Sequence, residues 1–372
     1  MKFTKLSLIA TLAMSAAFAG GDIAPTEAEV TTPVAAADCE KDTTIAGKAV
    51  GYYYSVEGSE DLFDKKNSQI GTAVTLDVAH KLTSNITANF SAVGYANLGE
   101  EEAGYMEGQE TGAFMNVANL TGTFGDTTVV VGRQLLDTPM LGSFDWLLAP
   151  SAFEAATIVN TSISNVTLVG SYVNKWRGNN SGSTFAELTD DNYAVGAAYS
   201  DAFDASVWYY NVDALDYTQV YADAGYTFSG ITLNAQYVTT DYASTDDSTA
   251  FGVKIGGEFA GMTASVAYNK IEDAAAGMVG VDSLYTSSWN VFASGIVDDS
   301  FKVALGTELA GFATEVSYAQ YGEEGSALDV VLGYDITNTL NLGVVFTATD
   351  YTYDDASDDA ENALEVFATY TF

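Results

Sequence analysis

The chain has 372 residues, of which 50 are acidic and 13 basic, and its formal net charge is −37. A chain this negative is repelled by nucleic acid and by anionic lipid, and its charge argues against both as partners unless divalent cations intervene. After the amino-terminal segment, no stretch has the 18 or more consecutive apolar residues of a membrane-spanning helix, so a helical membrane protein is excluded as well.

The amino-terminus has the layout of a secretory signal peptide. Two lysines precede an apolar run from Leu6 to Phe18, and Ala17 and Ala19 supply the small residues that signal peptidase reads. We predict a signal peptide over residues 1–19, whose removal changes the net charge to −39. Residues 20–42 are rich in Ala, Thr, Pro and Glu without a period, and are predicted to form a flexible periplasmic leader.

Residues suited to covalent attachment or catalysis are scarce. The only cysteine, Cys39, has no partner within a monomer. It also follows Asp38 and lies far beyond the apolar run, so we interpret it as an incidental free thiol rather than a lipid anchor. The only histidine, His80, falls in a strand pattern, and no serine or acid is singled out as its partner. The sequence does not predict an enzyme and calls for no cofactor.

From residue 43 to residue 372 the chain reads as short segments of alternating polarity. In Ile231 to Tyr237, for example, Ile, Leu, Ala and Tyr alternate with Thr, Asn and Gln. A period of two indicates strands with one apolar and one polar face. About 18 strands are predicted, starting near residues 43, 68, 85, 112, 127, 155, 166, 191, 204, 217, 231, 249, 262, 300, 312, 327, 339 and 363. Residues 271–300 are predicted to be a structured loop, and 16 strands is the alternative count.

The connections between these segments alternate in length. Tight turns such as Gly125-Asp126 and Ala260-Gly261 are followed by longer polar stretches such as residues 99–111 and 352–362. This alternation is typical of a transmembrane antiparallel β-barrel with short periplasmic turns and long extracellular loops. An all-β barrel in the outer membrane is therefore the predicted fold and location.

One long connection, residues 135–154, is apolar where the others are acidic, and it contains two of the four prolines in the chain. Apolar side chains need a surface to pack on, so this loop is predicted to fold into the barrel and narrow its pore. Asp137, Asp145 and Glu154 are the acids expected at the constriction. The alternative is a loop packed between subunits or over the mouth of the barrel.

Basic side chains are expected across the pore from these acids. Lys254 and Lys302 each lie between apolar residues, and Lys175 shares its parity with Thr167 and Ser171, so all three are predicted to face the lumen. Lys48 and Arg133 also lie within strands, where a charge facing lipid at the bilayer midplane costs about 2–4 kcal/mol. These five cations facing three loop acids would set up a transverse field across the pore. In a more modest interpretation, Lys254 and Lys302 simply pair with lumenal Glu258 and Glu308.

Acidic pairs gather in the long loops. They are Glu100-Glu101-Glu102, Asp190-Asp191, Asp246-Asp247, Asp298-Asp299, Glu323-Glu324, Asp354-Asp355 and Asp358-Asp359. Carboxylate oxygens are suitable ligands for Ca²⁺ or Mg²⁺, which could bind here loosely. None of the pairs has the spacing of a calcium-binding loop, and a solvated rim is the alternative.

The last ten residues, Ala363 to Phe372, alternate cleanly. Leu364, Val366, Ala368, Tyr370 and Phe372 share one face, and Glu365, Thr369 and Thr371 lie on the other, with Phe367 as the apolar exception. Ten residues suffice for a tilted strand to cross a bilayer. This segment looks like the closing strand of an outer-membrane barrel, in which Tyr370 and Phe372 would form the signal that the barrel-assembly machinery reads.

Taken together, the chain resembles Gram-negative porins, in particular the major outer-membrane protein porins and related substrate-selective porins. The resemblance rests on three features: residues 132–134 (Gly-Arg-Gln) leading into residues 137–139 (Asp-Thr-Pro), the run Tyr285 to Asn290, and the closing strand. It implies an 18-stranded barrel, usually a homotrimer, that passes small hydrophilic solutes and contacts lipopolysaccharide. The substrate-selective relatives carry a longer ladder of basic residues than the five cations found here, which favours a general diffusion pore.

The alternative to a porin is a structural or adhesive surface barrel whose acidic loops bind partners or divalent cations. A soluble secreted β-protein is a third, more remote possibility.

Overall fold

The computed structural model describes residues 42–57, 61–98, 111–145, 148–179, 182–323, 325–350 and 361–372. The predicted signal peptide (1–19), the predicted leader except its last residue, and Cys39 lie outside these ranges. Among the described residues, no helix is both long and apolar enough to cross a bilayer.

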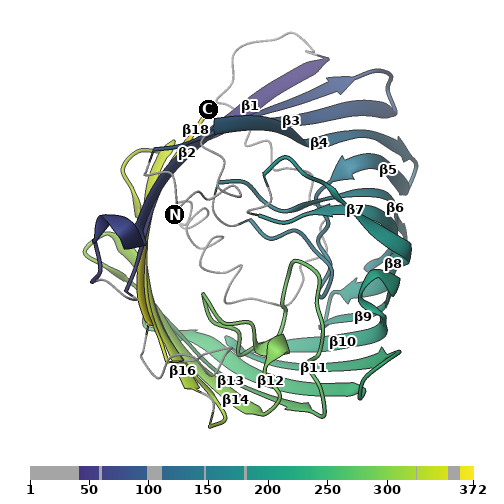
Figure 1. Ribbon diagram of the computed structural model, residues 1–372. Helices are drawn as coiled ribbons and strands as arrows, with labels where there is room; N and C mark the ends of the chain where they lie inside the picture. The colour runs from purple at the N-terminus through teal and green to yellow at the C-terminus, as the bar shows by residue number, and fades with distance from the viewer. Residues whose placement is uncertain are drawn as a thin grey trace.

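The described chain forms one antiparallel sheet that closes on itself (Figure 1). Each strand pairs with its neighbours in sequence, and β1 also pairs with β18. The strands are β1 (Thr43–Val56), β2 (Ser68–Lys81), β3 (Ile86–Asn97), β4 (Thr111–Phe124), β5 (Thr127–Gln134), β6 (Ala152–Ile163), β7 (Val166–Arg177), β8 (Ala186–Ser200), β9 (Asp204–Val212), β10 (Tyr217–Phe228), β11 (Ile231–Tyr242), β12 (Ser248–Phe259), β13 (Met262–Glu272), β14 (Asp299–Leu309), β15 (Phe312–Tyr321), β16 (Gly325–Asp335), β17 (Leu340–Thr349) and β18 (Glu361–Thr371). Three single-turn 3₁₀ helices, η1 (Lys65–Asn67), η2 (Asp213–Leu215) and η3 (Ala293–Gly295), lie in connections.

The prediction of 18 strands is confirmed, and the alternative of 16 is wrong. The largest difference in a predicted start is at β8, which begins at Ala186 rather than near residue 191. Residues 273–298 form a loop, as predicted, with only η3 and one isolated bridge as regular structure. The predicted loop 135–154 is shorter than expected, because β6 already begins at Ala152; Glu154 is therefore a strand residue.

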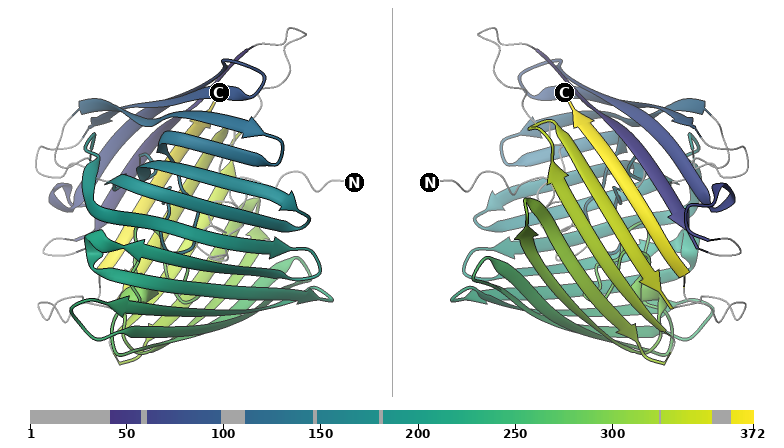
Figure 2. Two further views of the ribbon diagram at one scale, coloured as in Figure 1. Left: turned by 90° about the vertical axis from the view of Figure 1, so that its right-hand side faces the viewer. Right: turned by 90° about the vertical axis from the view of Figure 1, so that its left-hand side faces the viewer.

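Alternation along each strand separates an outer face from an inner face. On β12, Phe251, Val253 and Ile255 are exposed, whereas Ala250 and Gly252 between them are buried. Figure 2 shows the strands strongly tilted around the barrel, as closure of a sheet requires. Because a closed antiparallel sheet leaves no unpaired edge, its backbone can lie in hydrocarbon, and the apolar outer face contacts lipid. This is the architecture of a multi-pass outer-membrane barrel.

The barrel closes where the two ends of the described chain meet. Gly47 N donates to Phe372 O at 2.9 Å, and Phe372 N donates to Gly47 O at 3.0 Å. A Cβ at position 47 would lie 2.6 Å from the Phe372 ring, so only glycine leaves room for that ring. Tyr370 of β18 and Phe372 just after it are exposed on the outer face, and Glu365 is buried inside, which is the two-sided pattern expected from the sequence.

Whether the outer face of the barrel contacts lipid can be tested on β13. Val266 lies near the middle of this strand and is exposed, so Val266→Arg should lower the free energy of unfolding by about 2–4 kcal/mol. The measurement is urea unfolding of the protein in lipid vesicles.

Ser265→Arg provides the matched control, because residue 265 lies on the inner face of the same strand. Equal losses for both variants would contradict the assignment of inner and outer faces.

Candidate functional site

The loop between β5 and β6 (residues 135–151, the β5–β6 loop) enters the barrel and packs on aromatic side chains of the wall. Its Leu136, Met140 and Leu141 are buried with Trp208, Tyr210 and Tyr221, which face inward from β9 and β10. Met140 N also donates to the Tyr210 hydroxyl at 3.3 Å. This wall explains why the loop is apolar: aromatic surface inside the barrel covers it.

Arg177, at the end of β7, fixes the carboxy-terminal end of the same loop. Its guanidinium donates to Asn116 Oδ1 at 2.9 Å and to the carbonyl of Pro150, and lies 4.4 Å over the Phe114 ring. The side chain is fully buried, so these contacts replace its hydration. The sequence had not singled out Arg177 or the inward-facing aromatic residues as parts of the site.

A second loop, between β13 and β14 (residues 273–298, the β13–β14 loop), joins the first inside the barrel. Val279 forms a parallel bridge with Leu141, in which Gly142 N donates to Val279 O at 3.0 Å and Val279 N donates to Met140 O at 2.8 Å. Ser283 Oγ donates to Pro139 O at 2.6 Å. The two loops therefore form one hydrogen-bonded unit within the lumen.

The β13–β14 loop is braced internally by Asp282. This carboxylate accepts hydrogen bonds from Leu284 N at 2.8 Å, Ser294 N at 2.9 Å and Ser287 Oγ at 2.9 Å. Burial raises the pKa of Asp282, and these three donors oppose that shift by stabilising the charged form. The bonds tie the two arms of the loop together and give it a fixed shape.

Of the predicted charges, the structure brings Lys48 and Asp145 together. Lys48 faces inward from β1, and its Nζ lies 3.2 Å from Asp145 Oδ2 on the β5–β6 loop. The pair links the loop to the wall of β1 and leaves the Asp145 side chain more than half exposed. Asp137 is also exposed, nearer the start of the loop.

Three other predicted residues, Arg133, Glu154 and Lys175, form a row across β5, β6 and β7. Arg133 lies 3.7 Å and Lys175 3.5 Å from Glu154, and the three are cross-strand neighbours. The row shares its parity with Val131 and Ile158, which are exposed on the outer face.

The prediction of a lumenal Lys175 is therefore wrong, because a bulge at Asn174 reverses the parity inferred from Thr167 and Ser171. Arg133 and Glu154, which were expected at the constriction, share the outer-face parity of this row. The row lies at the strand ends on the long-loop rim, where water and headgroups rather than hydrocarbon meet a charge.

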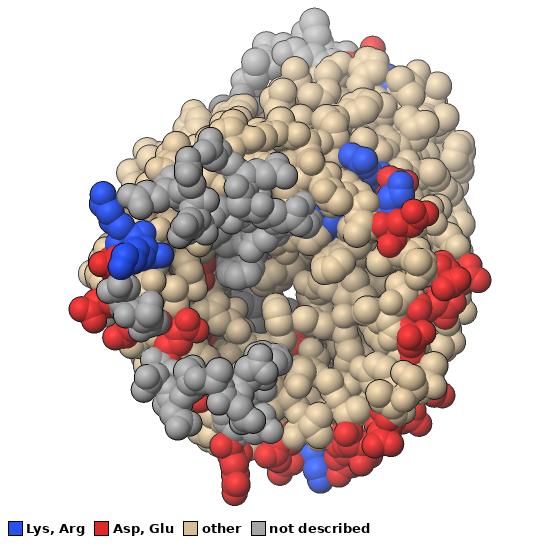
Figure 3. Space-filling view, in the orientation of Figure 1, with Lys and Arg blue, Asp and Glu red and all other residues tan. Residues whose placement is uncertain are grey.

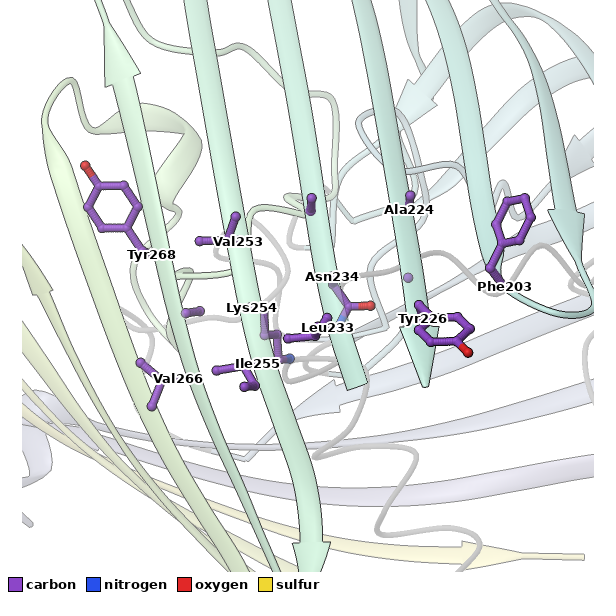
Figure 4. Close-up of a pocket in the computed structure, with 13 residues that line it drawn as sticks. Phe203, Ala224, Tyr226, Leu233, Asn234, Val253, Lys254, Ile255, Val266 and Tyr268 are labelled. Carbon is purple, nitrogen blue, oxygen red and sulfur yellow. The ribbon is translucent and has the colours of Figure 1, made fainter. Parts of the chain in front are cut away.

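Lys254 and Lys302 occupy the inner face. Figure 4 shows Val253 and Ile255 on one side of β12 and Lys254 on the other, in the wall behind a shallow apolar groove. Lys302 is almost fully buried, because its Nζ donates to Ser287 O at 2.7 Å beneath the β13–β14 loop. Glu315 of β15 lies on the same inner face as the two lysines, whose pairing with Glu258 and Glu308 stays a prediction.

Acidic side chains are spread along much of the rim in Figure 3, and a small opening is visible near the middle of this face. Among the described residues, no three Asp, Glu, His or Cys side chains gather as they would around a metal ion. Glu100-Glu101-Glu102, Asp354-Asp355 and Asp358-Asp359 lie outside the described ranges, as does Glu324. His80 is on β2, with its Nδ1 2.7 Å from Thr43 Oγ1.

No protein-family model matches the chain, and no curated protein shows significant sequence similarity to it. Solved structures do match. A BenF-like porin from Pseudomonas fluorescens Pf-5 and the outer membrane protein OpdK from Pseudomonas aeruginosa each give a TM-score of 0.76 at 14% identity, over 89% of this chain and 98% of theirs. OccAB3 from Acinetobacter baumannii gives 0.75 at 14% identity, over 89% and 99%.

The first of these structures is named as a porin and the second as an outer membrane protein. At this level of identity the likeness concerns the fold, and it agrees with the resemblance inferred from the sequence. The chain has the 18-stranded barrel fold of outer-membrane porins, among which it is similar in structure to the OpdK and OccAB3 proteins.

Proposed function

We propose that this protein is an outer-membrane porin through which small hydrophilic solutes and ions diffuse passively. The observation that carries the proposal is the pair of joined loops inside a closed barrel, which narrows a lumen lined by polar side chains. A structural barrel has no need to fold two loops inward against its own wall, whereas a selective pore needs such a constriction.

The charges of the lumen favour cations as the preferred ions. In the described strands, acids on the inner-face parity outnumber bases. The acids outside the contacts of the β13–β14 loop are Asp77, Asp204, Asp223, Glu258, Glu308, Glu315, Asp335 and Glu361, and the lysines are Lys48, Lys81, Lys254 and Lys302. Asp329 and Glu365 share this face but are buried against the loop. A pore lined with excess carboxylate concentrates cations and repels anions.

The lysines also count for less than their number suggests. Lys48 is paired with Asp145, and Lys302 is covered by the β13–β14 loop. Two of the similar structures hold vanillate and glucuronate, whose carboxylates are negative. The lumen described here is unsuited to such anions, so we propose neutral and cationic solutes for this chain.

The proposed partners of the protein follow from its sequence. We propose that Tyr370 and Phe372 are read by the barrel-assembly machinery, that the rim contacts lipopolysaccharide, and that the acidic loops hold Ca²⁺ or Mg²⁺ loosely. Assembly as a homotrimer is a proposal of the same kind, derived from the family resemblance. Conductance steps that occur in triplets would support it.

The refolded mature protein should conduct in a planar bilayer, with a reversal potential in a salt gradient that has the sign of cation preference. Single-channel recording measures both properties. Folded, inserted protein without conductance would contradict the porin proposal and favour a structural barrel. Conductance with anion preference would contradict only the assignment of selectivity.

Replacing Asp137 and Asp145 with asparagine should weaken the cation preference. In water a unit charge 4 Å away contributes about 1 kcal/mol, so each acid raises local cation occupancy about fivefold. Asp145→Asn also releases Lys48 from its ion pair. The readout is the shift of the reversal potential.

Glu154→Gln is the matched control for this experiment, because Glu154 lies on the outer-face parity at the rim. It should leave the reversal potential unchanged. Unchanged selectivity in the Asp137 and Asp145 variants would remove these residues from the constriction.

A further inference from the structure

Residues 285–290 (Tyr-Thr-Ser-Ser-Trp-Asn, the wall segment) lie along the inner face of the barrel. The wall segment belongs to the β13–β14 loop and bonds to successive strands from β14 to β18. Tyr321 of β15 donates to Thr286 O at 2.9 Å, and Asn290 Nδ2 donates to Thr347 Oγ1 of β17 at 2.9 Å. The barrel wall therefore recognises this short run residue by residue.

Glu365 of β18 is at the centre of this recognition. Trp289 Nε1 donates to its Oε1 at 2.7 Å, and the Tyr52 hydroxyl of β1 donates to its Oε2 at 2.7 Å. The Glu365 side chain is almost fully buried, so these two donors replace its water. Through one carboxylate, the loop is tied to the seam between the last and first strands.

Asp329 of β16 binds the same tryptophan through the backbone. Trp289 N donates to Asp329 Oδ2 at 3.0 Å, and Ser317 Oγ of β15 donates to the same oxygen at 3.3 Å. Lys302 completes the arrangement from β14 by donating to Ser287 O. Three ionisable wall residues thus hold Ser287 and Trp289 of the loop.

The other arm of the loop is held by a different part of the wall. Tyr242 of β11 donates to Ala275 O at 2.8 Å, and Gln219 of β10 donates to Gly277 O at 3.0 Å. Between the two anchored arms lies Val279, which pairs with Leu141 of the β5–β6 loop. The β13–β14 loop therefore spans the lumen between two fixed ends and carries the other loop at its middle.

The buried carboxylates make this docking specific. If the loop withdrew, Glu365 and Asp329 would face lumenal water, which would supply hydrogen bonds to both carboxylates. When the loop docks, both lose that water, and docking is favourable only where its donors meet both carboxylates. A hydrogen bond to a charged group that is left unmade shifts such an equilibrium by about tenfold or more.

We propose that Glu365 and Asp329 are positioning residues that set the free cross-section of the pore by holding the β13–β14 loop, and through it the β5–β6 loop, in place. The proposal rests on the porin function proposed above. In this role Glu365 and Asp329 determine the width of the pore without contacting the solute.

The test is Glu365→Leu, measured by single-channel conductance and by the size of neutral polyethylene glycols that still enter the pore. Leucine leaves the Trp289 and Tyr52 donors without an acceptor. The loop should therefore spend more time undocked, conductance and current noise should rise, and the polymer cut-off should shift to larger sizes.

Glu365→Gln should restore values near those of the unaltered protein, because its amide oxygen accepts from Trp289 and its NH₂ donates to the Tyr52 hydroxyl. Glu308→Leu is the matched control, since Glu308 is an inner-face acid far along β14 from the wall segment. It should alter ion preference and leave the polymer cut-off unchanged.

Trp289→Phe removes the indole N–H that donates to Glu365, so it breaks the same hydrogen bond from the loop. This variant tests the proposal if Glu365→Leu does not fold. An unchanged polymer cut-off in a folded, conducting Glu365→Leu or Trp289→Phe variant would overturn the proposal. An unaltered protein that is folded and inserted but does not conduct would instead overturn the porin function itself.

Discussion

The structure depends on one constraint: in hydrocarbon every backbone N–H and C=O must find a partner within the protein. An antiparallel sheet meets this requirement only when it closes, and closure requires the first and last strands to pair, as β1 and β18 do. Closure also separates two solvents. The outer face must be apolar, whereas the inner face is free to carry charge, and the inner-face lysines and carboxylates are the result.

A barrel of 18 strands encloses more space than its wall side chains fill, and the chain uses that space for two loops. The β5–β6 loop packs on the apolar surface of Trp208, Tyr210 and Tyr221 and is also held by Arg177 and Lys48. The β13–β14 loop contributes to the same apolar cluster and is hydrogen-bonded to Glu365, Asp329 and Lys302. Each loop is therefore attached to the wall by its own contacts, and the bridge between Leu141 and Val279 joins them.

Much of the fold could be predicted from the sequence, because a period of two is a local signal with a direct physical cause. This periodicity gave the wrong face, or no face, for residues whose orientation depends on tertiary structure. A single bulge at Asn174 reversed the face assigned to Lys175, and no pattern marks a bulge in advance. On β9 both faces are aromatic, so Trp208 could not be assigned to the lumen. The contacts of Arg177 and Glu365 join residues 61 and 76 positions away, beyond the reach of periodicity.

The contact between Gly47 and Phe372 has a consequence for the order of events during biogenesis. The first strand finds its second neighbour only when the final residue is present, so the sheet cannot close progressively as the chain emerges. Until then both terminal strands offer unpaired edges, which are templates for aggregation. A contact of such long sequence separation also slows folding. Closure of the barrel is therefore the last pairing to form, and the unpaired edges of β1 and β18 need protection from other chains until it does.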